Sequence, residues 1–334
     1  MYRTAATLLG GCFLAGMASS CIDEDLSKCG ADYALKYRVE LHTVLDDELN
    51  RELTTPAERA LADKLRTALS GFFSDHAQDL SLQFYTPDRN LSHYEQHVIN
   101  SNEAGYTLYL PVDDYRHLAL ANTEAERVVD VAGRKSRQTL ALSQQKADTI
   151  PFHSNALFLG REDISLSSGK SEFIVPLYMQ NSAVSLVLDP GDNTVEAYRC
   201  YVSGMADGFR CNDSLYTYEA DPVIRTGRID AAGLTGFYAG CFPSPSELPR
   251  RGVSPASDVS DAAEDAYWQL HLYVTIGGKT TYNRMYVKSP LYAGTLRIIK
   301  ARIKENGEVV VDAREVGVSI TLDWKPGGDH DVEI

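Results

Sequence analysis

The sequence has few cysteines and a shortage of basic residues. Its 334 residues include 6 cysteines and no Cys-x-x-Cys pair, which argues against redox catalysis and against a zinc site. The 32 Lys and Arg residues are outnumbered by 46 Asp and Glu residues, and the resulting net charge of −14 opposes binding to phosphate backbones and anionic lipid head groups. We therefore expect no nucleic-acid partner.

The motifs of common catalytic and nucleotide-binding sites are also absent. The chain contains no Gly-x-x-x-x-Gly-Lys-Ser/Thr, no Gly-x-Gly-x-x-Gly, no His-Glu-x-x-His and no Gly-x-Ser-x-Gly. The sequence therefore predicts no catalytic residue, no cofactor, no metal and no small-molecule substrate.

Only one apolar run could enter a membrane, and it is too short to span one. It covers Ala5 to Met17, follows Arg3 and ends in small residues. This pattern predicts a secretory signal peptide over residues 1–20 and hence export. The next residue is Cys21, where a lipoprotein signal would be cut and fatty acyl chains such as palmitate attached. The alternative is an ordinary signal peptide that happens to end before a cysteine.

Residues 21–32 form an acidic tether between Cys21 and the first predicted strand. Its acids fit either an export address for the outer face of a Gram-negative outer membrane or a plain solvated linker, and the sequence leaves both open.

Four further cysteines follow Cys21. Cys200 and Cys211 are close in sequence within a run that can fold back on itself, so we favour a disulfide between them over pairs with Cys29 or Cys241. Free, buried cysteines are the competing interpretation.

Short runs of alternating apolar and polar residues dominate the chain, beginning with Tyr33 to Val44. The one clear helix starts with the capping box at Thr55 to Glu58 and carries an apolar stripe to about Phe73. Many short strands between turns are typical of β-sandwiches. We predict a mainly β fold with two domains, 33–179 containing the helix and 180–334. The remaining strands are expected at 80–85, 105–110, 115–121, 156–159, 172–178, 183–188, 195–202, 268–276, 281–287, 295–303 and 316–324.

Two connections and one insertion stand out in the second half. Asn306-Gly307 indicates a two-residue hairpin before Val309 to Val311, and Asp189-Pro190-Gly191-Asp192 indicates a turn rather than a calcium loop. The stretch from Pro243 to Glu264 is rich in Ser, Pro, Asp and Ala, which is typical of a mobile or binding loop.

Two patterns suggest binding chemistry only weakly. His93 and His97 are four residues apart, the spacing of two metal ligands on one helix. The residues around them do not show the apolar periodicity of a helix, so we favour two surface histidines. The 19 tyrosines against 2 tryptophans fit strand surfaces better than a sugar-binding platform.

Both ends of the mature chain resemble one family. Cys21 is followed by acids and by Asp25-Leu26-Ser27-Lys28-Cys29, and the last strand runs through Val316-Gly317-Val318-Ser319-Ile320-Thr321-Leu322-Asp323-Trp324-Lys325-Pro326-Gly327-Gly328. These segments are similar to those of the fimbrillin-A-associated anchor lipoproteins of Bacteroidales-type fimbriae. The resemblance implies two transthyretin-like β-sandwiches in tandem.

The resemblance also implies a function. Such a protein is held by its lipid in the outer membrane, anchors a fimbria, helps to limit fibre length, and binds major or accessory fimbrial subunits by β-strand addition. An accessory or tip subunit is the related alternative. In stalk subunits an arginine after the first strand can be a maturation site; Arg51 holds that place, and we predict that it is not cleaved. The rival functions are a cell-surface glycan-binding lipoprotein and an enzyme of unrecognised chemistry.

Overall fold

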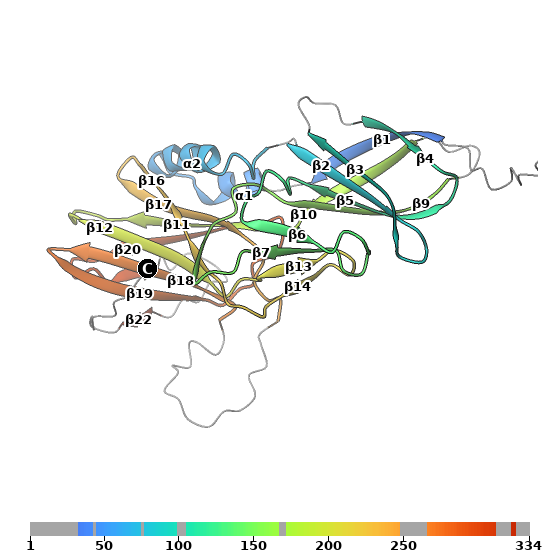
Figure 1. Ribbon diagram of the computed structural model, residues 1–334. Coiled ribbons are helices and arrows are strands. Elements are labelled where there is room, and N and C mark those ends of the chain that lie inside the picture. The colour runs from blue at the N-terminus through green and yellow to red at the C-terminus, as the bar shows by residue number, and fades with distance from the viewer. Residues whose placement is uncertain are drawn as a thin grey trace, which may run out of the picture.

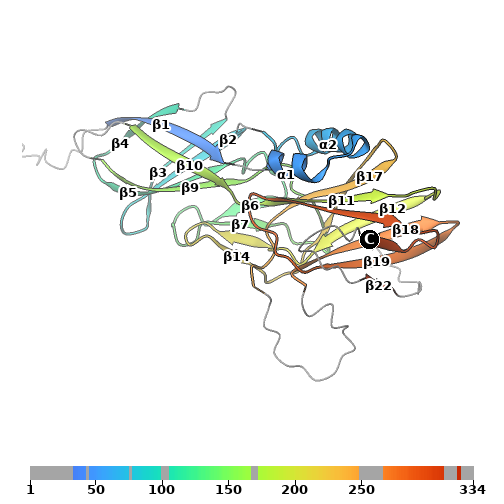
Figure 2. The same cartoon turned by 180° about the vertical axis from the view of Figure 1, so that it is seen from behind.

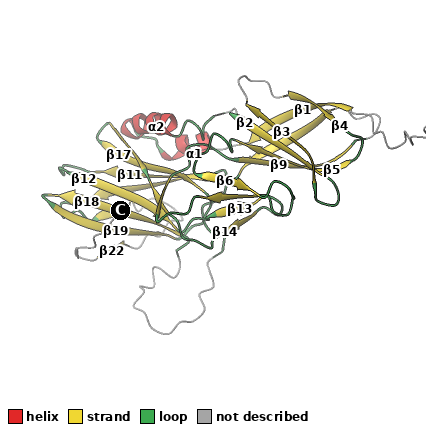
Figure 3. Cartoon of the chain, in the orientation of Figure 1, coloured by secondary structure: helices red, strands yellow, loops and turns green. Residues whose placement is uncertain are grey.

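The computed structural model describes residues 33–42, 45–74, 77–98, 105–166, 172–247, 266–311 and 322–324. Within these ranges the chain is mainly β, with two helices lying together at one side (Figures 1 and 3). The predicted fold class is confirmed. Cys21, Cys29, residues 1–32 and nearly all of the Ser- and Pro-rich insertion lie outside the described residues, as does most of the predicted last strand.

Seven strands from the first half form a mixed sheet in the order β3-β2-β5-β9-β10-β1-β4. All neighbours are antiparallel except β1 and β10, which are parallel. The strands are β1 (Tyr33–His42), β2 (Asp79–Tyr85), β3 (Leu91–Val98), β4 (Gly105–Leu110), β5 (Asp114–Ala121), β9 (Phe158–Ser165) and β10 (Glu172–Met179).

This sheet folds over on itself between β9 and β10. The two strands pair only at Tyr178 with Leu159 and at Met179 with Phe158. A Cβ atom on Gly160 would lie 2.7 Å from the side chains of Val175 and Leu177, so a glycine is needed where the two layers approach each other. The result is a two-layer sandwich of β3-β2-β5-β9 and β10-β1-β4.

The second half contributes two sheets that pack face to face. The five-stranded sheet has the order β16-β17-β11-β20-β21 and the six-stranded sheet the order β22-β19-β18-β12-β15-β8. Trp268 and Leu272 lie in the core between them, at most 1% exposed. The strands are β8 (Thr149–Pro151), β11 (Ser182–Asp189), β12 (Ala197–Ser203), β15 (Val223–Arg225), β16 (Gly227–Ala231), β17 (Leu234–Cys241), β18 (Trp268–Ile276), β19 (Lys279–Val287), β20 (Leu296–Ile303), β21 (Val309–Val311) and β22 (Leu322–Trp324).

A fourth, small sheet joins segments from both halves of the chain. Its order is β14-β13-β7-β6, with β6 (Val129–Ala132), β7 (Ala141–Gln144), β13 (Gly208–Arg210) and β14 (Leu215–Thr217). Side chains of this sheet share a buried cluster with Leu118 and Leu120 on the outer face of β5. Because β7 pairs with β13 and β8 with β15, strands on either side of position 179/180 are interleaved. The predicted division at that position stays a prediction.

Two helices cover the outer face of the five-stranded sheet: α1 (Leu45–Glu52) and α2 (Pro56–Ala68) (Figures 1 and 2). The predicted capping box at α2 is confirmed, because the Thr55 hydroxyl accepts from Glu58 N and the Glu58 carboxylate accepts from Thr55 N. Leu61 reaches the sheet at Gly236. The predicted helix thus lies early in the sequence but packs on strands from the second half. α1 is only 8 residues long, too short to show a clear apolar stripe, and it was not predicted.

The predicted hairpin and turn are confirmed by their hydrogen bonds, but the hairpin loop is longer than the predicted two residues. Lys304 N donates to Glu308 O at 2.8 Å, which leaves Glu305, Asn306 and Gly307 in the loop, with Gly307 at a φ of +81°. Gly191 N donates to the Asp189 carboxylate at 2.9 Å with Gly191 at a φ of +58°, as a turn requires.

Candidate functional site

The first strand sits in the middle of its layer. β1 pairs with β10 from Lys36 to His42 and with β4 from Tyr33 to Arg38, so it is held on both sides. The predicted tether, residues 21–32, directly precedes this strand in the sequence. β1 is thus fixed in the sheet by two hydrogen-bonded ladders.

The seam between β9 and β10 joins the two layers, and one of these layers ends at β4. From Glu172 to Leu177, β10 forms its ladder with β1, while Gly160 of β9 packs against Val175 and Leu177. β4 pairs from Gly105 to Leu110 with β1 and has no other partner strand among the described residues. Such an edge can accept an extended segment of another chain.

The free edge of β3 is polar on both faces. Glu95 accepts from His93 Nε2 at 2.7 Å and from His97 Nε2 at 3.0 Å, because residues two apart on a strand share a face. The two histidines thus lie on a strand, not a helix. No group of three metal-ligating side chains occurs among the residues that the structure places.

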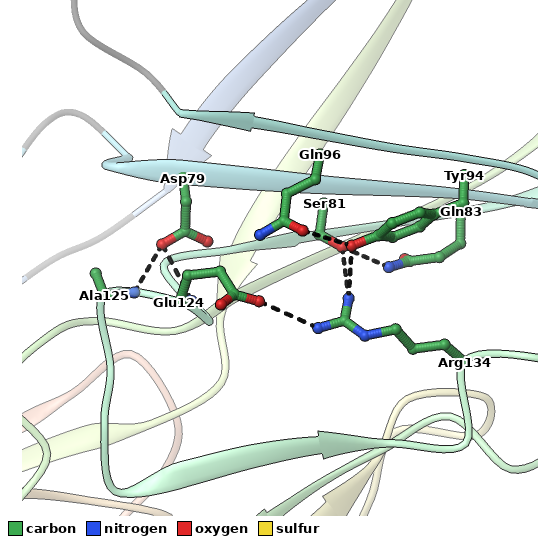
Figure 4. Close-up of polar contacts among 8 residues, drawn as sticks. All are labelled: Asp79, Ser81, Gln83, Tyr94, Gln96, Glu124, Ala125 and Arg134. Atoms are coloured by element: carbon green, nitrogen blue, oxygen red, sulfur yellow. Dashed lines mark hydrogen bonds and ion pairs between the residues drawn. The ribbon is translucent and has the colours of Figure 1, made fainter.

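On its other face, β3 joins a polar cluster around Arg134 (Figure 4). One guanidinium nitrogen of Arg134 donates to Ser81 Oγ at 2.9 Å and to Tyr94 Oη at 3.3 Å, and the other to Glu124 at 3.3 Å. Gln83 is fully buried beside Ser81 and donates to it at 2.7 Å. The cluster links the seven-stranded sheet to the loops before and after β6.

A fully buried polar network lies at the junction of the two halves. The Glu126 carboxylate accepts from the backbone N–H of Ser154 at 2.6 Å, of Asn155 at 2.9 Å and of Val128 at 3.1 Å. These bonds satisfy a carboxylate that is 2% exposed and explain why it can be buried without a cation. The network fixes the loop before β9 against the loop before β6.

The cysteines that the structure describes are buried thiols. Cys200 lies in the core of the second sandwich and Cys211 in the cluster beside the small sheet; both are free, as is Cys241. The favoured Cys200–Cys211 disulfide is not formed here, because β12 and the turn after β13 direct these side chains into different cores. Burial raises the pKa of each of the three thiols to about 12.

The tyrosines of the six-stranded sheet have covered ring faces. Tyr273 and Tyr282 stack with centroids 4.8 Å apart, and the guanidinium groups of Arg199 and Arg284 lie over these rings at 5.5 Å and 5.6 Å. A sugar ring needs an open aromatic face, so this group stabilises the sheet surface instead.

Arg51 lies within α1, not in an extended loop. Its side chain is 66% exposed and pairs with Glu52 at 3.0 Å. The helix is held to β20 because the Glu48 carboxylate accepts from Leu296 N, and burial of that carboxyl raises its pKa. In the described ranges no helix is long and apolar enough to cross a bilayer.

Comparisons with known proteins agree with this architecture. Residues 53–233, just over half of the chain, match the family of fimbrillin-A associated anchor proteins Mfa1 and Mfa2. The chain belongs to this family. No curated protein sequence matches it.

Solved structures of other proteins have a similar fold. A proposed adhesin from Bacteroides thetaiotaomicron VPI-5482 is 9% identical with a TM-score of 0.51, covering 88% of this chain and 97% of that one. A proposed adhesin from Bacteroides ovatus is 11% identical, also at 0.51, covering 92% and 98%. The fimbrial anchor protein Mfa2 from Porphyromonas gingivalis is 10% identical at 0.49, covering 88% and 98%.

Family membership confirms the resemblance found in the sequence. The protein is accordingly a fimbrial protein of the cell surface that interacts with other fimbrial subunits. The sequence missed the β9–β10 seam and the junction network, because both depend on strand pairing over long separations.

Proposed function

We propose that this protein is a non-enzymatic fimbrial anchor held in the outer membrane by acyl chains on Cys21. The match to the anchor family over residues 53–233 is the observation that carries the proposal. The short apolar run ending at Ser20 supports cleavage and acylation at the next residue. Residues 21–32 would then be the tether, and 33–179 and 180–334 the two sandwich domains.

We further propose that the anchor binds its neighbour through a strand edge. β1 already fills the position between β10 and β4, whereas β4, at the edge of the sheet, pairs with β1 alone among the described residues. An extended segment of another subunit could add there, with main-chain hydrogen bonds giving affinity. With lipid at its other end, the protein would have a single polymerising interface and so limit fibre length.

The test of anchorage is Cys21→Ala expressed in the fimbriated cell. Without the thiol no acyl chain can be attached, so we expect both the protein and the fibres in the medium. Cys29→Ala is the matched control, because it removes a thiol from the same tether, and it should leave fibres on the cells. Fibres that stay on cells carrying Cys21→Ala would refute anchorage by this residue.

Crosslinking on intact cells distinguishes the anchor from an accessory or tip subunit. An anchor is expected to crosslink to a polymerising subunit close to the membrane. Labelling with antibody should place it at fibre bases; label at free fibre ends would favour the tip role.

A further inference from the structure

Apolar side chains gather on the outer face of the layer β10-β1-β4. Tyr109 is 64% exposed, Ile174 49% and Tyr178 56%, and Tyr292 in the loop before β20 is 55% exposed. Isolated exposed apolar residues are common, but a group on one sheet face marks an interaction surface. The other layer of this sandwich has its outer face packed against the small four-stranded sheet.

Strand register places three of these residues in one stripe. Tyr109 pairs with Ala34, Ile174 with Arg38, and Tyr178 with His42. The three β1 positions are four residues apart and so share a face. Eight residues separate the ends, which gives a stripe about 26 Å long at 3.3 Å per residue. Figure 2 shows β4, β1 and β10 side by side in one layer.

Tyr292 lies in the loop before β20, near the end of β10. Its loop is fixed to the chain that follows β10, because Gly294 N donates to Asn181 O at 2.9 Å. We call Tyr109, Ile174, Tyr178 and Tyr292 the apolar stripe.

The stripe begins where the tether enters the fold. Tyr33 is the first residue of β1 and pairs with Leu110, next to Tyr109. Twelve residues separate Cys21 from Tyr33, and a fully extended chain of that length spans about 43 Å at most. With Cys21 at a bilayer, all of the stripe lies within reach of the same membrane surface.

We propose that the apolar stripe rests on the head-group region of the bilayer that holds the lipid on Cys21. The inference rests on the proposed anchoring. Tyrosine suits this region because its ring is apolar and its hydroxyl stays hydrated. A weak contact suffices beside acyl chains, since membrane attachment commonly combines two signals. The contact holds the first sandwich in one orientation, so that the anchor does not swing on its tether.

Charge selects the kind of lipid. With a net charge of −14 the chain is repelled by anionic surfaces, so the contact is expected with zwitterionic lipid. Adding anionic lipid at low salt should weaken it, and raising the salt concentration should restore it.

The test couples Cys21 to a maleimide lipid in phosphatidylcholine vesicles and measures tyrosine modification by mass spectrometry. Cys29→Ala makes Cys21 the reactive thiol, since burial keeps Cys200, Cys211 and Cys241 from reacting. We expect Tyr109, Tyr178 and Tyr292 to react about tenfold more slowly than in the uncoupled protein mixed with plain vesicles, which corresponds to a contact free energy of about 1.4 kcal/mol. Tyr218, 43% exposed on another surface, is the internal control.

Three results would overturn the proposal. Equal modification of Tyr109 and Tyr178 with and without coupling would show that the stripe does not touch lipid. Unchanged protection in the double variant Ile174→Ser, Tyr178→Ser would show that Tyr109 is shielded by something else. Protection that rises with protein concentration without vesicles would assign the stripe to self-association. Because coupling replaces natural acylation, none of these results depends on whether Cys21 is lipidated in the cell.

Discussion

Asn181 holds the ring of His153 at the junction between the two halves, with 3.3 Å between Asn181 Nδ2 and His153 Nδ1. Asn181 Oδ1 accepts from Leu157 N at 2.9 Å, which fixes the amide, so Nδ2 is the donor and His153 Nδ1 the acceptor. His153 then carries its proton on Nε2. That nitrogen lies 3.0 Å from the Gln144 side-chain amide. When this amide is rotated by 180°, Gln144 Oε1, which otherwise has no hydrogen-bond partner, accepts from His153 Nε2.

Replacing Asn181 should lower the free energy of unfolding, because its side chain satisfies buried backbone groups. Asn181→Ala removes the acceptor of Leu157 N and the donor to Asn155 O in a region with no access to water. We expect the free energy of unfolding in urea to fall by about 2–4 kcal/mol, the cost of leaving buried polar groups unpaired. Asn50→Ala, on the exposed side of α1, should change it by less than about 0.5 kcal/mol. Similar losses in both variants would contradict the junction's role.

Acid should destabilise the protein through two buried histidines. Burial lowers the pKa of both His117 and His153 to about 3 in the folded chain. Between about pH 6.5 and pH 3 the unfolded chain binds protons that the folded chain cannot, so stability falls as pH falls, by up to about 1.4 kcal/mol per pH unit for each histidine.

Urea unfolding at several pH values checks this. His117→Phe keeps a ring stacked on Phe84, where the centroids are now 4.3 Å apart, but removes the titrating group. The fall in stability from pH 6 to pH 4 should therefore be smaller in this variant by about 1.4 kcal/mol per unit. Gln96→Ala, on the edge strand β3, removes no titrating group and should leave the slope unchanged. An unaltered slope in His117→Phe would show that this residue is not the source.

The described thiols should be unreactive until the chain unfolds. Cys200, Cys211 and Cys241 are at most 4% exposed, and burial raises the pKa of each to about 12, so little thiolate forms at neutral pH. Maleimide labelling of the protein purified from cells, followed by peptide mass analysis, should modify them in urea but not in buffer. A linked peptide containing Cys200 and Cys211 under non-reducing conditions would restore the disulfide hypothesis.

Arg51 should survive on the mature protein. A protease must bind its substrate in extended form, and unwinding α1 would remove Leu45 and Leu49 from the core, where they are at most 1% exposed. We expect mass spectrometry of protein from fimbriated cells to find an N-terminus at Cys21. An N-terminus at Glu52 would show that the anchor is processed as stalk subunits are.

Local patterns fixed the secondary structure well in several places. The run from Trp268 to Ile276 alternates and is β18, and the capping box at Thr55 does open α2. In each case the deciding contacts lie within a few residues of one another, so composition and spacing suffice. α1 and β8 escaped prediction because they pack on or pair with β20 and β15, which are more than 50 residues away.

The candidate site was much less predictable. The sequence indicated an exported β protein and singled out Cys21, but nothing in it shows that β4 becomes an edge strand, since this follows from strand pairing over long separations. It also suggested a Cys200–Cys211 pair from proximity alone, whereas the pleat of β12 and the turn after β13 send the two thiols into separate cores.

The sequence alone thus determined the mainly β fold and the family, and it predicted lipidation at Cys21, because these depend on periodicity and on short motifs. Tertiary structure decided where the helices pack, which strand edges stay open, and that Tyr109, Ile174 and Tyr178 share one exposed face. The physical reason is that strand register brings together residues 65 or more positions apart, and no local pattern records which strands become neighbours.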